Sequence, residues 1–402
     1  MWWTAPGPPT WPDCGSPVSD WLYLDNNATT RLAPEVLESM LPCFQEHYGN
    51  PSSAHVLGLL AEGALVQARE QVAGLLNCQP AELVFNGSGT EGLNHAFRGV
   101  FEASPAKRHF ITTAVEHSAV LSLVEWLRRQ GADVTVLPVD GEGRLDLDSL
   151  EAAIRPETAL VSVMAANNET GVCFPLEAIA RIVKAKGALF HVDGTQAGGK
   201  LPLDLAGLPA DLLNLSAHKL HGPKGVGALF IRRGLRLKPF MVGGHQERGR
   251  RGGTENLPGI VGFGRAAALA QRGLDDMARV RQLRDGLEAA LRAAVPEIRI
   301  HGEAASRLPN TSFIGFAGIE GEALLLRLSQ AGICVATGSA CTTGQKEPSH
   351  VLRAMGVDGA FALGTVRLSL SRYTTEDEIA RVVEVLPGLV QELRDARPMA
   401  RR

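Results

Sequence analysis

The chain has 402 residues, of which 45% are hydrophobic and 21% charged, a size and balance typical of a globular protein with one or two domains. Its net charge of -3 gives no general electrostatic attraction to nucleic acid or to an anionic membrane surface. No uninterrupted apolar stretch reaches the ~18 residues that a membrane-spanning helix needs, so we expect neither a nucleic-acid-binding nor a membrane protein.

The segment 1–20 is rich in proline and has no basic stretch before an apolar run. It is therefore predicted to be a disordered arm and not a secretory signal. The six cysteines form no CxxC pair and no zinc-finger spacing, so no intrinsic metal site is expected. Without a secretory signal, a reducing cytoplasm is the expected location.

From about residue 60, short apolar runs alternate with segments of helical length. Between several of these runs lie stretches, such as 119–130 and 176–187, with apolar residues at the three- and four-residue spacing of helices. The alternation predicts an α/β fold with a largely parallel sheet covered by helices. Ligands of such sheets bind at the carboxyl ends of the strands. The predicted strands are 83–85, 109–113, 134–139, 159–164, 188–193 and 227–233.

The pattern changes after residue 260. A long helical run at about 257–294 is followed by the apolar runs IRI, TSFIGF and VRLSLS, which predict further strands. We therefore expect a large domain at 21–260 and a smaller α+β domain at 261–402, with the first few residues of the large domain packing on the small one.

Two candidate cofactor-binding features lie early in the predicted sheet. The Gly-rich segment NGSGTEGLNHA (86–96) joins a strand to a helix, so the backbone amides of Gly89 and Thr90 can point at a phosphate. Such a loop is also often only a turn, and no GxxxxGK[ST] motif supports a nucleoside triphosphatase. His117 can stack on a flat ring and transfer protons near neutral pH, although a single histidine after a strand is more often structural.

Further polar residues follow later predicted strands. Asp193 ends an apolar run, and a buried carboxylate there needs a positive partner such as the pyridinium nitrogen of pyridoxal phosphate, although a helix cap is an alternative. Gln196 can hydrogen-bond a ring hydroxyl. Lys219 is a candidate Schiff-base lysine, whereas a lysine taken alone is usually a surface charge. Its neighbours Ser216 and His218 can both donate to a phosphate.

The last third of the chain contains a candidate nucleophile and a candidate carboxylate-binding residue. Cys341 lies among small residues in 337–356, which predicts a flexible, exposed loop; a reactive thiol and a structural surface thiol are equal alternatives there. Arg367 interrupts an apolar run, and its guanidinium suits an amino-acid carboxylate. Asn168 can add a hydrogen bond to that carboxylate, and Arg372 is a more exposed alternative to Arg367.

These motifs occur together in one order and cover residues 23 to 379. The chain resembles the cysteine desulfurases of the NifS/IscS type, within the class V aminotransferase family. The resemblance implies the type I fold of pyridoxal-phosphate-dependent transferases, in which a large domain with a mainly parallel seven-stranded sheet carries a smaller α+β domain. The motifs are YLDNNATT, GNPSSAH, GTEGLNHA, TAVEHSAV, ANNETG, HVDGTQ, HKLHGPKGVG, GGHQERGRRGGTEN, GSACTTG, EPSHVLRAMG and SLSRYTTEDEI.

The resemblance also implies roles for single residues. Lys219 is expected to be the Schiff-base lysine, Asp193 the partner of the pyridine nitrogen, and His117 the residue that stacks on the ring. Cys341 is expected to be the nucleophile. The other expected roles are the ring oxygen for Gln196, the phosphate for Gly89, Thr90, Ser216 and His218, the substrate carboxylate for Asn168 and Arg367, and the phosphate of the neighbouring subunit for Thr254.

The expected activity is the conversion of L-cysteine to L-alanine, with the sulfur transferred to Cys341 as a persulfide. Lys219 is expected to move the substrate proton. The resemblance further implies a homodimer and a sulfur-acceptor protein such as an iron–sulfur scaffold, with nitrogenase as one of the pathways served and Cys341 as a transient ligand of a nascent cluster. The sequence differs from the family pattern at two places: Gly-Leu-Asn follows the Thr-Glu pair, and Ala217 stands where glycine is frequent. Neither difference removes any of these donors.

Two other classes of function remain open. Another reaction of the same family, by an aminotransferase, a selenocysteine lyase or a kynureninase-like hydrolase, would need Lys219 and Asp193 but not Cys341. A sulfur-carrier or scaffold protein without catalysis would need no cofactor. The complete set of cofactor-binding residues from His117 to Lys219 argues against this last class.

Overall fold

The computed structural model describes residues 21–337 and 348–396. The predicted arm at 1–20 and the candidate nucleophile Cys341 therefore lie outside the described residues.

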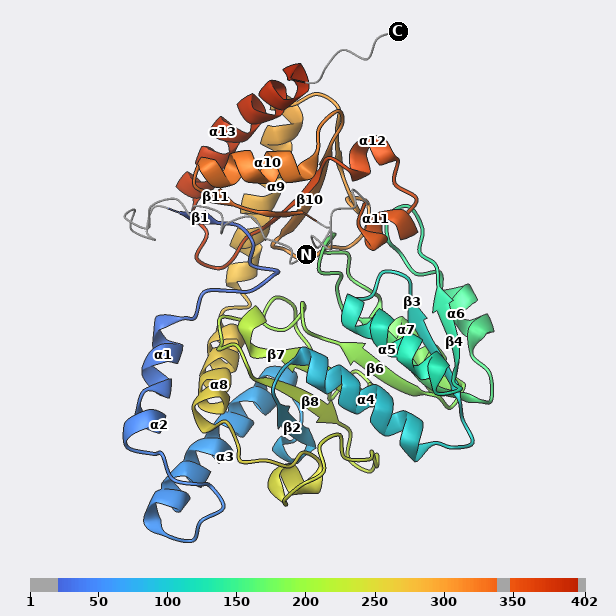
Figure 1. Cartoon of the computed structure of the whole chain (residues 1–402), viewed down its shortest axis with the longest axis vertical. Helices are drawn as coiled ribbons and strands as arrows, with labels where there is room; N and C mark the ends of the chain where they lie inside the picture. Colours follow the sequence, from blue (N-terminus) through green and yellow to red (C-terminus); the bar gives the residue numbers. More distant parts are fainter. Residues whose placement is uncertain (1–20, 338–347, 397–402) are drawn as a thin grey trace, which may run out of the picture.

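A seven-stranded sheet is the centre of the larger part of the molecule (Figure 1). Its strand order is β2–β8–β7–β6–β5–β3–β4, and only β8 runs antiparallel to its neighbours. The predicted α/β fold with a mainly parallel sheet is confirmed. The strands are β2 (Leu83–Asn86), β3 (His109–Thr113), β4 (Asp133–Leu137), β5 (Thr158–Met164), β6 (Leu189–Asp193), β7 (Leu212–Ser216) and β8 (Gly227–Ile231).

Helices cover both faces of this sheet, so most of its strands are apolar and buried along their whole length. One face packs against α4 (Gly89–Ala103) and α5 (Ser118–Arg129). The other face packs against α3 (Val56–Leu76), α6 (Leu147–Ala153), α7 (Leu176–Ala185) and α8 (Leu257–Arg272). Helices α3 and α8 approach closely at Gly264, where a β-carbon would lie 2.6 Å from the Cα atom of Ala68.

A second, four-stranded antiparallel sheet lies above the first in Figure 1, in the order β12–β13–β10–β9. Its core is shared with α9 (Asp276–Ala294), α10 (Gly321–Gln330) and α13 (Glu376–Asp395). The predicted helical run at 257–294 is two helices, because α8 ends at Arg272 with Gly273 as its C-cap. The strands are β9 (Ile298–Ile300), β10 (Thr311–Phe316), β12 (Ala336–Thr337) and β13 (Thr365–Ser369).

The N-terminal segment crosses between the two parts. Strand β1 (Leu22–Tyr23) pairs in parallel with β11 (Ile333–Cys334), and Leu22 and Leu24 belong to the same apolar core as α9 and α13. The chain then enters the larger part through α1 (Pro34–Met40) and α2 (Pro42–Gln45). This route places residues 25–30 between the two sheets.

The prediction of an exposed loop over 337–356 is wrong in its second half. Residues His350–Ala354 form α11, which is followed by α12 (Gly359–Ala362), and Val351 and Leu352 are buried. The apolar pair at 351–352 packs into the core, and the side chain of Ser349 caps the helix by accepting from Val351 N. Among the described residues, no helix is long and apolar enough to cross a membrane.

Candidate active site

A cavity of about 210 Å³ lies at the carboxyl ends of the parallel strands of the large sheet. Strands β2, β3, β5, β6 and β7 all contribute residues that follow them directly, as expected for ligand sites of parallel sheets. The structure thus brings together most of the residues singled out from the sequence. The lining residues are Ser88, Gly89, Thr90, Leu93, His117, Met164, Ala166, Asn168, Asp193, Thr195, Gln196, Ser216, His218 and Lys219.

One end of the cavity is built to hold an anion. Helix α4 begins at Gly89, and the side chain of Ser88 caps it by accepting from Glu91 N at 3.1 Å. The backbone N–H groups of Gly89 and Thr90 stand in the first turn, where a helix offers them no acceptor of its own. Burial lowers the pKa of His218 to about 4, so its imidazole is neutral at pH 7 and can donate one hydrogen bond.

Asp193 forms another part of the cavity wall. Its Oδ1 accepts from Thr195 N at 3.0 Å and from Asn214 Nδ2 at 3.1 Å, which leaves Oδ2 for a partner in the cavity. Asn214 Oδ1 is in turn 2.9 Å from Nε2 of His191, a fully buried histidine of β6. No ion pair to Asp193 is formed within the described part of the chain, so a cation in the cavity would complete the site.

His117 lies at the start of α5 and also faces the cavity. Its Nδ1 accepts from Ala119 N at 3.1 Å, so the neutral ring carries its proton on Nε2. Burial lowers the pKa of His117, and Lys219 and His350 act in the same direction. The preceding residue, Glu116, is fully buried, and burial raises its pKa to about 8. Its Oε1 accepts from Thr113 Oγ1 at 2.8 Å and from Met164 N at 3.0 Å, which ties the segment before His117 to β5.

Lys219 is placed by the short 3-10 turn η3 (Ala217–Lys219), which follows β7 directly. Its Nζ donates to the carbonyl oxygens of Asn27 at 2.6 Å and Ala28 at 2.8 Å. Burial lowers its pKa to about 8, with a further contribution from Arg367. About a tenth of this lysine is thus a free amine at pH 7, far more than of an ordinary lysine, as a nucleophilic lysine requires.

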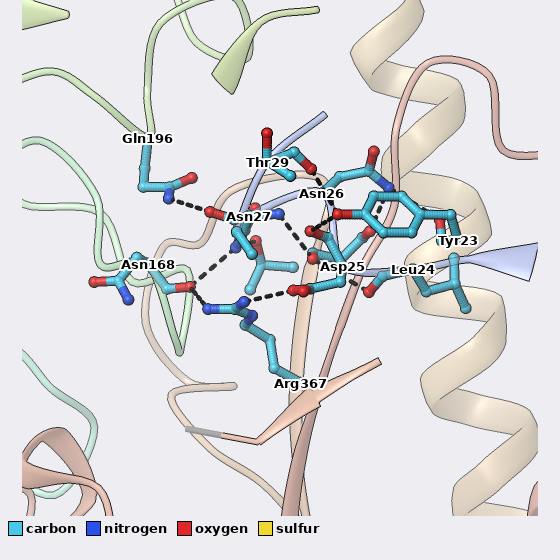
Figure 2. Close-up of polar contacts among 12 residues, drawn as sticks. Tyr23, Leu24, Asp25, Asn26, Asn27, Thr29, Asn168, Gln196 and Arg367 are labelled. Carbon is cyan, nitrogen blue, oxygen red and sulfur yellow. Dashed lines mark hydrogen bonds and ion pairs between the residues drawn. The ribbon is translucent and has the colours of Figure 1, made fainter. Parts of the chain in front are cut away.

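The N-terminal segment supplies contacts that the sequence did not single out (Figure 2). The carbonyl oxygen of Asn27 accepts from Gln196 Nε2 at 2.9 Å. The same oxygen accepts from Lys219. The side chain of Asn27 donates to the carbonyl of Asn168 at 3.1 Å and to Thr311 Oγ1 at 2.9 Å. In the sequence, the motif YLDNNATT was the only sign that this segment matters, and its residue types do not indicate what Asn27 does.

Arg367 lies beside the cavity, where the two sheets meet (Figure 2). Its Nη1 donates to the Asn168 carbonyl at 2.9 Å, and its Nη2 to Asp25 Oδ1 at 2.7 Å. The Nε atom is buried and has no hydrogen-bond partner among the described residues. Since a guanidinium group has five N–H donors, Arg367 keeps donors for an anionic ligand while Asp25 holds its orientation.

Thr254 does not line this cavity. It is exposed and borders a second cavity of about 180 Å³, together with Arg251, Glu255 and Asn256. Within one copy of the chain, the structure therefore does not bring Thr254 to the residues around Lys219.

The fold and the site together define a class of protein. A lysine with a lowered pKa, a buried carboxylate and a helix N-terminus surround one cavity at the edge of a parallel sheet, and this set suits a cofactor that combines an aldehyde, a basic ring nitrogen and a phosphate. The family model for class V aminotransferases matches residues 22–382. The chain belongs to the class V aminotransferase family, whose enzymes depend on pyridoxal 5′-phosphate.

Within this family, the chain is similar to proteins described as cysteine desulfurases or NifS-like proteins. A protein of Trichormus variabilis described as cysteine desulfurase 2 is 54% identical over 379 residues, which cover 94% of this chain and 95% of that protein. A solved NifS-like protein is 42% identical with a TM-score of 0.88, over 93% of this chain and 100% of its own. The structure of SspA in complex with cysteine is 34% identical with a TM-score of 0.78, over 88% and 100% of the two chains.

The residues of the cavity fit pyridoxal phosphate. The buried Asp193, which lacks an ion pair among the described residues, matches a protonated ring nitrogen. The first turn of α4, with Ser216 and His218, matches the phosphate, and the partly deprotonated Lys219 matches the aldehyde. The predicted cofactor is thus confirmed by the family and is consistent with the geometry.

Proposed function

We propose that this chain is a cysteine desulfurase, which converts L-cysteine to L-alanine and transfers the sulfur to Cys341. The main support for the proposal is the cavity that Lys219, Asp193 and Asn168 line together, with Arg367 beside it and bonded to Asn168. The similarity over almost the whole chain to proteins described as cysteine desulfurases supports the choice of reaction.

In this proposal, Lys219 would hold the cofactor and, as a free amine, would take the substrate Cα proton. Asp193 would pair with the ring nitrogen, and His117 would contact the ring. When bound, pyridoxal phosphate supplies an electron sink that stabilises negative charge at the substrate carbon. The proposed phosphate ligands are Gly89, Thr90, Ser216 and His218, and Gln196 donates to the ring oxygen.

The substrate carboxylate is assigned to Arg367 and Asn168. Arg367 is held by Asp25 at 2.7 Å, so its remaining donors are oriented before the substrate arrives. This arrangement favours an α-amino acid over an amine, because an amine offers no carboxylate to the buried guanidinium.

The sulfur transfer is assigned to Cys341 as a thiolate, which attacks the substrate sulfur. A new S–S bond forms while the C–S bond of the substrate breaks, and its electron pair stays on carbon, which takes up a proton. The products are alanine and a persulfide on Cys341, so that sulfur is oxidised as carbon is reduced. Neutral His117, with its proton on Nε2, is placed to take part in the proton transfers.

We further propose a homodimer. Exposed apolar side chains gather on α1, α2 and the first turns of α3, which is unusual for a surface that faces only water. The isolated position of Thr254 fits a role at the phosphate of a neighbouring subunit. The apolar residues are Leu37, Leu41, Phe44, Tyr48, Val56, Leu59 and Leu60.

Three finer assignments remain part of the proposal. The separate apolar cores around the two sheets support domains at 21–260 and 261–402, with Leu22 and Leu24 packing on the smaller one.

Free thiols at the described cysteines, such as Cys43 and Cys78, support a cytoplasmic location. The sulfur acceptor is proposed to be an iron–sulfur scaffold protein, in keeping with the NifS-like relatives, and Cys341 a transient cluster ligand.

The test compares the wild type with Cys341→Ser. The holoenzyme should be yellow and release alanine and, with a thiol reductant, sulfide from L-cysteine. The variant should keep the colour and lose sulfide release. Sulfide release at the wild-type rate by the variant would remove Cys341 from the mechanism, and a coloured wild type that makes no alanine from cysteine would indicate another reaction of the family.

A further inference from the structure

A second lysine lies buried behind the cavity. Lys200 is only 9% exposed, and its Nζ donates to the backbone oxygen of Gln196 at 3.1 Å and to the side-chain Oε1 of Gln196 at 3.0 Å. Gln196 itself lines the cavity, whereas Lys200 does not. The hydrogen bonds of Lys200 therefore connect it to the site through Gln196.

The surroundings of Lys200 are cationic. Lys219 and Arg367 both oppose its charge, and Arg372 borders the small cavity that Lys200 also lines. No ion pair between Lys200 and a carboxylate is found in the described ranges, whereas Lys184 is held by Asp211 at 2.8 Å. Burial, with contributions from Lys219 and Arg367, lowers the pKa of Lys200 to about 7. Placing a lysine here costs folding free energy, which favours a role in the site over a role in stability.

The contacts determine which way the Gln196 amide points. The Asn27 carbonyl can only accept, so it must meet Nε2, at 2.9 Å, and this orientation turns Oε1 toward Lys200, which donates to it. Both hydrogen bonds are therefore consistent with a single orientation of the Gln196 amide. One of the two Nε2 hydrogens goes to Asn27, and the other is left for an acceptor in the cavity.

The same carbonyl of Asn27 also accepts from Lys219 Nζ at 2.6 Å. A continuous chain of hydrogen bonds thus runs from Lys200 through Gln196 and Asn27 to Lys219. A free glutamine could rotate its amide and present Oε1 to the cavity instead, which would repel an anionic oxygen.

We propose that Lys200 is a positioning residue that holds the Gln196 amide as a hydrogen-bond donor toward the ring oxygen of the bound cofactor. The inference rests on the proposed function insofar as it places the cofactor in this cavity, and it assigns no role in the sulfur transfer. A donor at this oxygen stabilises its deprotonated form. Loss of Lys200 should therefore raise the pH at which the bound chromophore titrates.

The experiment follows the visible absorption of the holoenzyme as a function of pH. Lys200→Met, which keeps the length of the side chain without its charge, should raise the titration midpoint by roughly one pH unit. Gln196→Ala should raise it similarly, and the double variant should add no further shift. The exposed Lys186 gives the matched control, since Lys186→Met should leave the midpoint unchanged.

Several outcomes would overturn the inference. An unchanged midpoint in Lys200→Met would do so, and so would a shift that persists when Gln196 is already alanine, since Lys200 would then act through its charge alone.

Gln196→Glu offers Lys200 a carboxylate but removes the donor. It should raise the midpoint even if Lys200→Met does not fold, and a lowered or unchanged midpoint would contradict the assignment. The titration needs bound cofactor but no turnover, so a coloured wild type that fails to desulfurate cysteine contradicts the proposed function alone.

Discussion

The side-chain nitrogen of Lys219 donates a hydrogen bond of 2.6 Å to the backbone carbonyl of Asn27. Asn27 precedes the first strand of the large sheet and lies in the turn after the bridge between Asp25 and Ser369, whereas Lys219 lies between β7 and β8. The contact holds the amine at the wall of the cavity without an ion pair. Because a carbonyl stabilises the ammonium only weakly, burial and Arg367 are able to lower the pKa to about 8.

Covalent attachment of the cofactor should depend on Lys219 alone. Reduction of the holoenzyme with borohydride should leave the cofactor on the peptide that contains Lys219, because this amine is partly deprotonated at neutral pH. Lys219→Ala should give no such adduct, as measured by peptide mass spectrometry. Lys224→Ala, which changes an exposed lysine nearby, should leave the adduct intact. Recovery of the label on another lysine would contradict the assignment.

Replacement of Arg367 by lysine should weaken substrate binding. Lysine keeps the charge but loses the forked donors that contact Asp25 and the Asn168 carbonyl. Because a hydrogen bond to a charged group contributes about 1.5–3 kcal/mol, we expect KM for cysteine to rise roughly ten- to a hundredfold. Steady-state kinetics with cysteine would measure this rise in KM. Arg372→Lys serves as the control, and an equal effect there would assign the carboxylate to Arg372.

The buried ion pair between Arg69 and Glu247 should matter for stability. Glu247 bonds Arg69 at 2.6 Å and accepts from Phe85 N at 3.0 Å, and it has a left-handed backbone with φ of 47°. Glu247→Gln leaves a buried cation, which typically costs about 3–5 kcal/mol of unfolding free energy. Urea unfolding measures the loss. The exposed pair of Glu125 and Arg128 provides the contrast, since Glu125→Gln should cost less than ~1 kcal/mol.

The apolar surface on α1 and α2 should determine the oligomeric state. Phe44 is 61% exposed, and a charge introduced there would have to be buried in the proposed homodimer. Phe44→Glu should shift the protein toward the monomer in light scattering coupled to size-exclusion chromatography. Leu326→Glu, on the distant α10 and equally exposed at 61%, should leave the mass unchanged. A dimeric Phe44→Glu would place the interface elsewhere.

Glu116 should make stability depend on pH. Burial raises its pKa from an ordinary 4.5 to about 8, so between these values the folded state binds more protons than the unfolded state, and stability falls as pH rises. Glu116→Gln removes this dependence. The melting temperature of the wild type relative to the variant should therefore decrease from pH 5 to pH 8, by the equivalent of ~1 kcal/mol or more. A constant difference would show that Glu116 is charged throughout.

The alternation of apolar runs and helical spacing was sufficient to predict the α/β class, because both faces of the sheet are covered and its strands read as continuous apolar runs. Strand β7 did not stand out, since Asn214 and Ser216 interrupt its apolar pattern while the helix-covered environment still buries both. The same limit applies to α11, which the sequence presented as an exposed loop although Val351 and Leu352 are buried.

The motifs around Asp193 and His117 were visible in the sequence because each follows a predicted strand, and parallel strands end at a common edge. Lys219 follows β7, which was not predicted, and it stood out through its neighbours Ser216 and His218. The contributions of Asn27, Asp25 and Lys200 depended on the tertiary structure. They act through a backbone carbonyl, an ion pair with Arg367 and a bond to Gln196, contacts that residue type and spacing do not reveal. Local patterns thus identified which side chains carry chemistry, while the three-dimensional fold decided what holds them, because those partners lie up to hundreds of residues away along the chain.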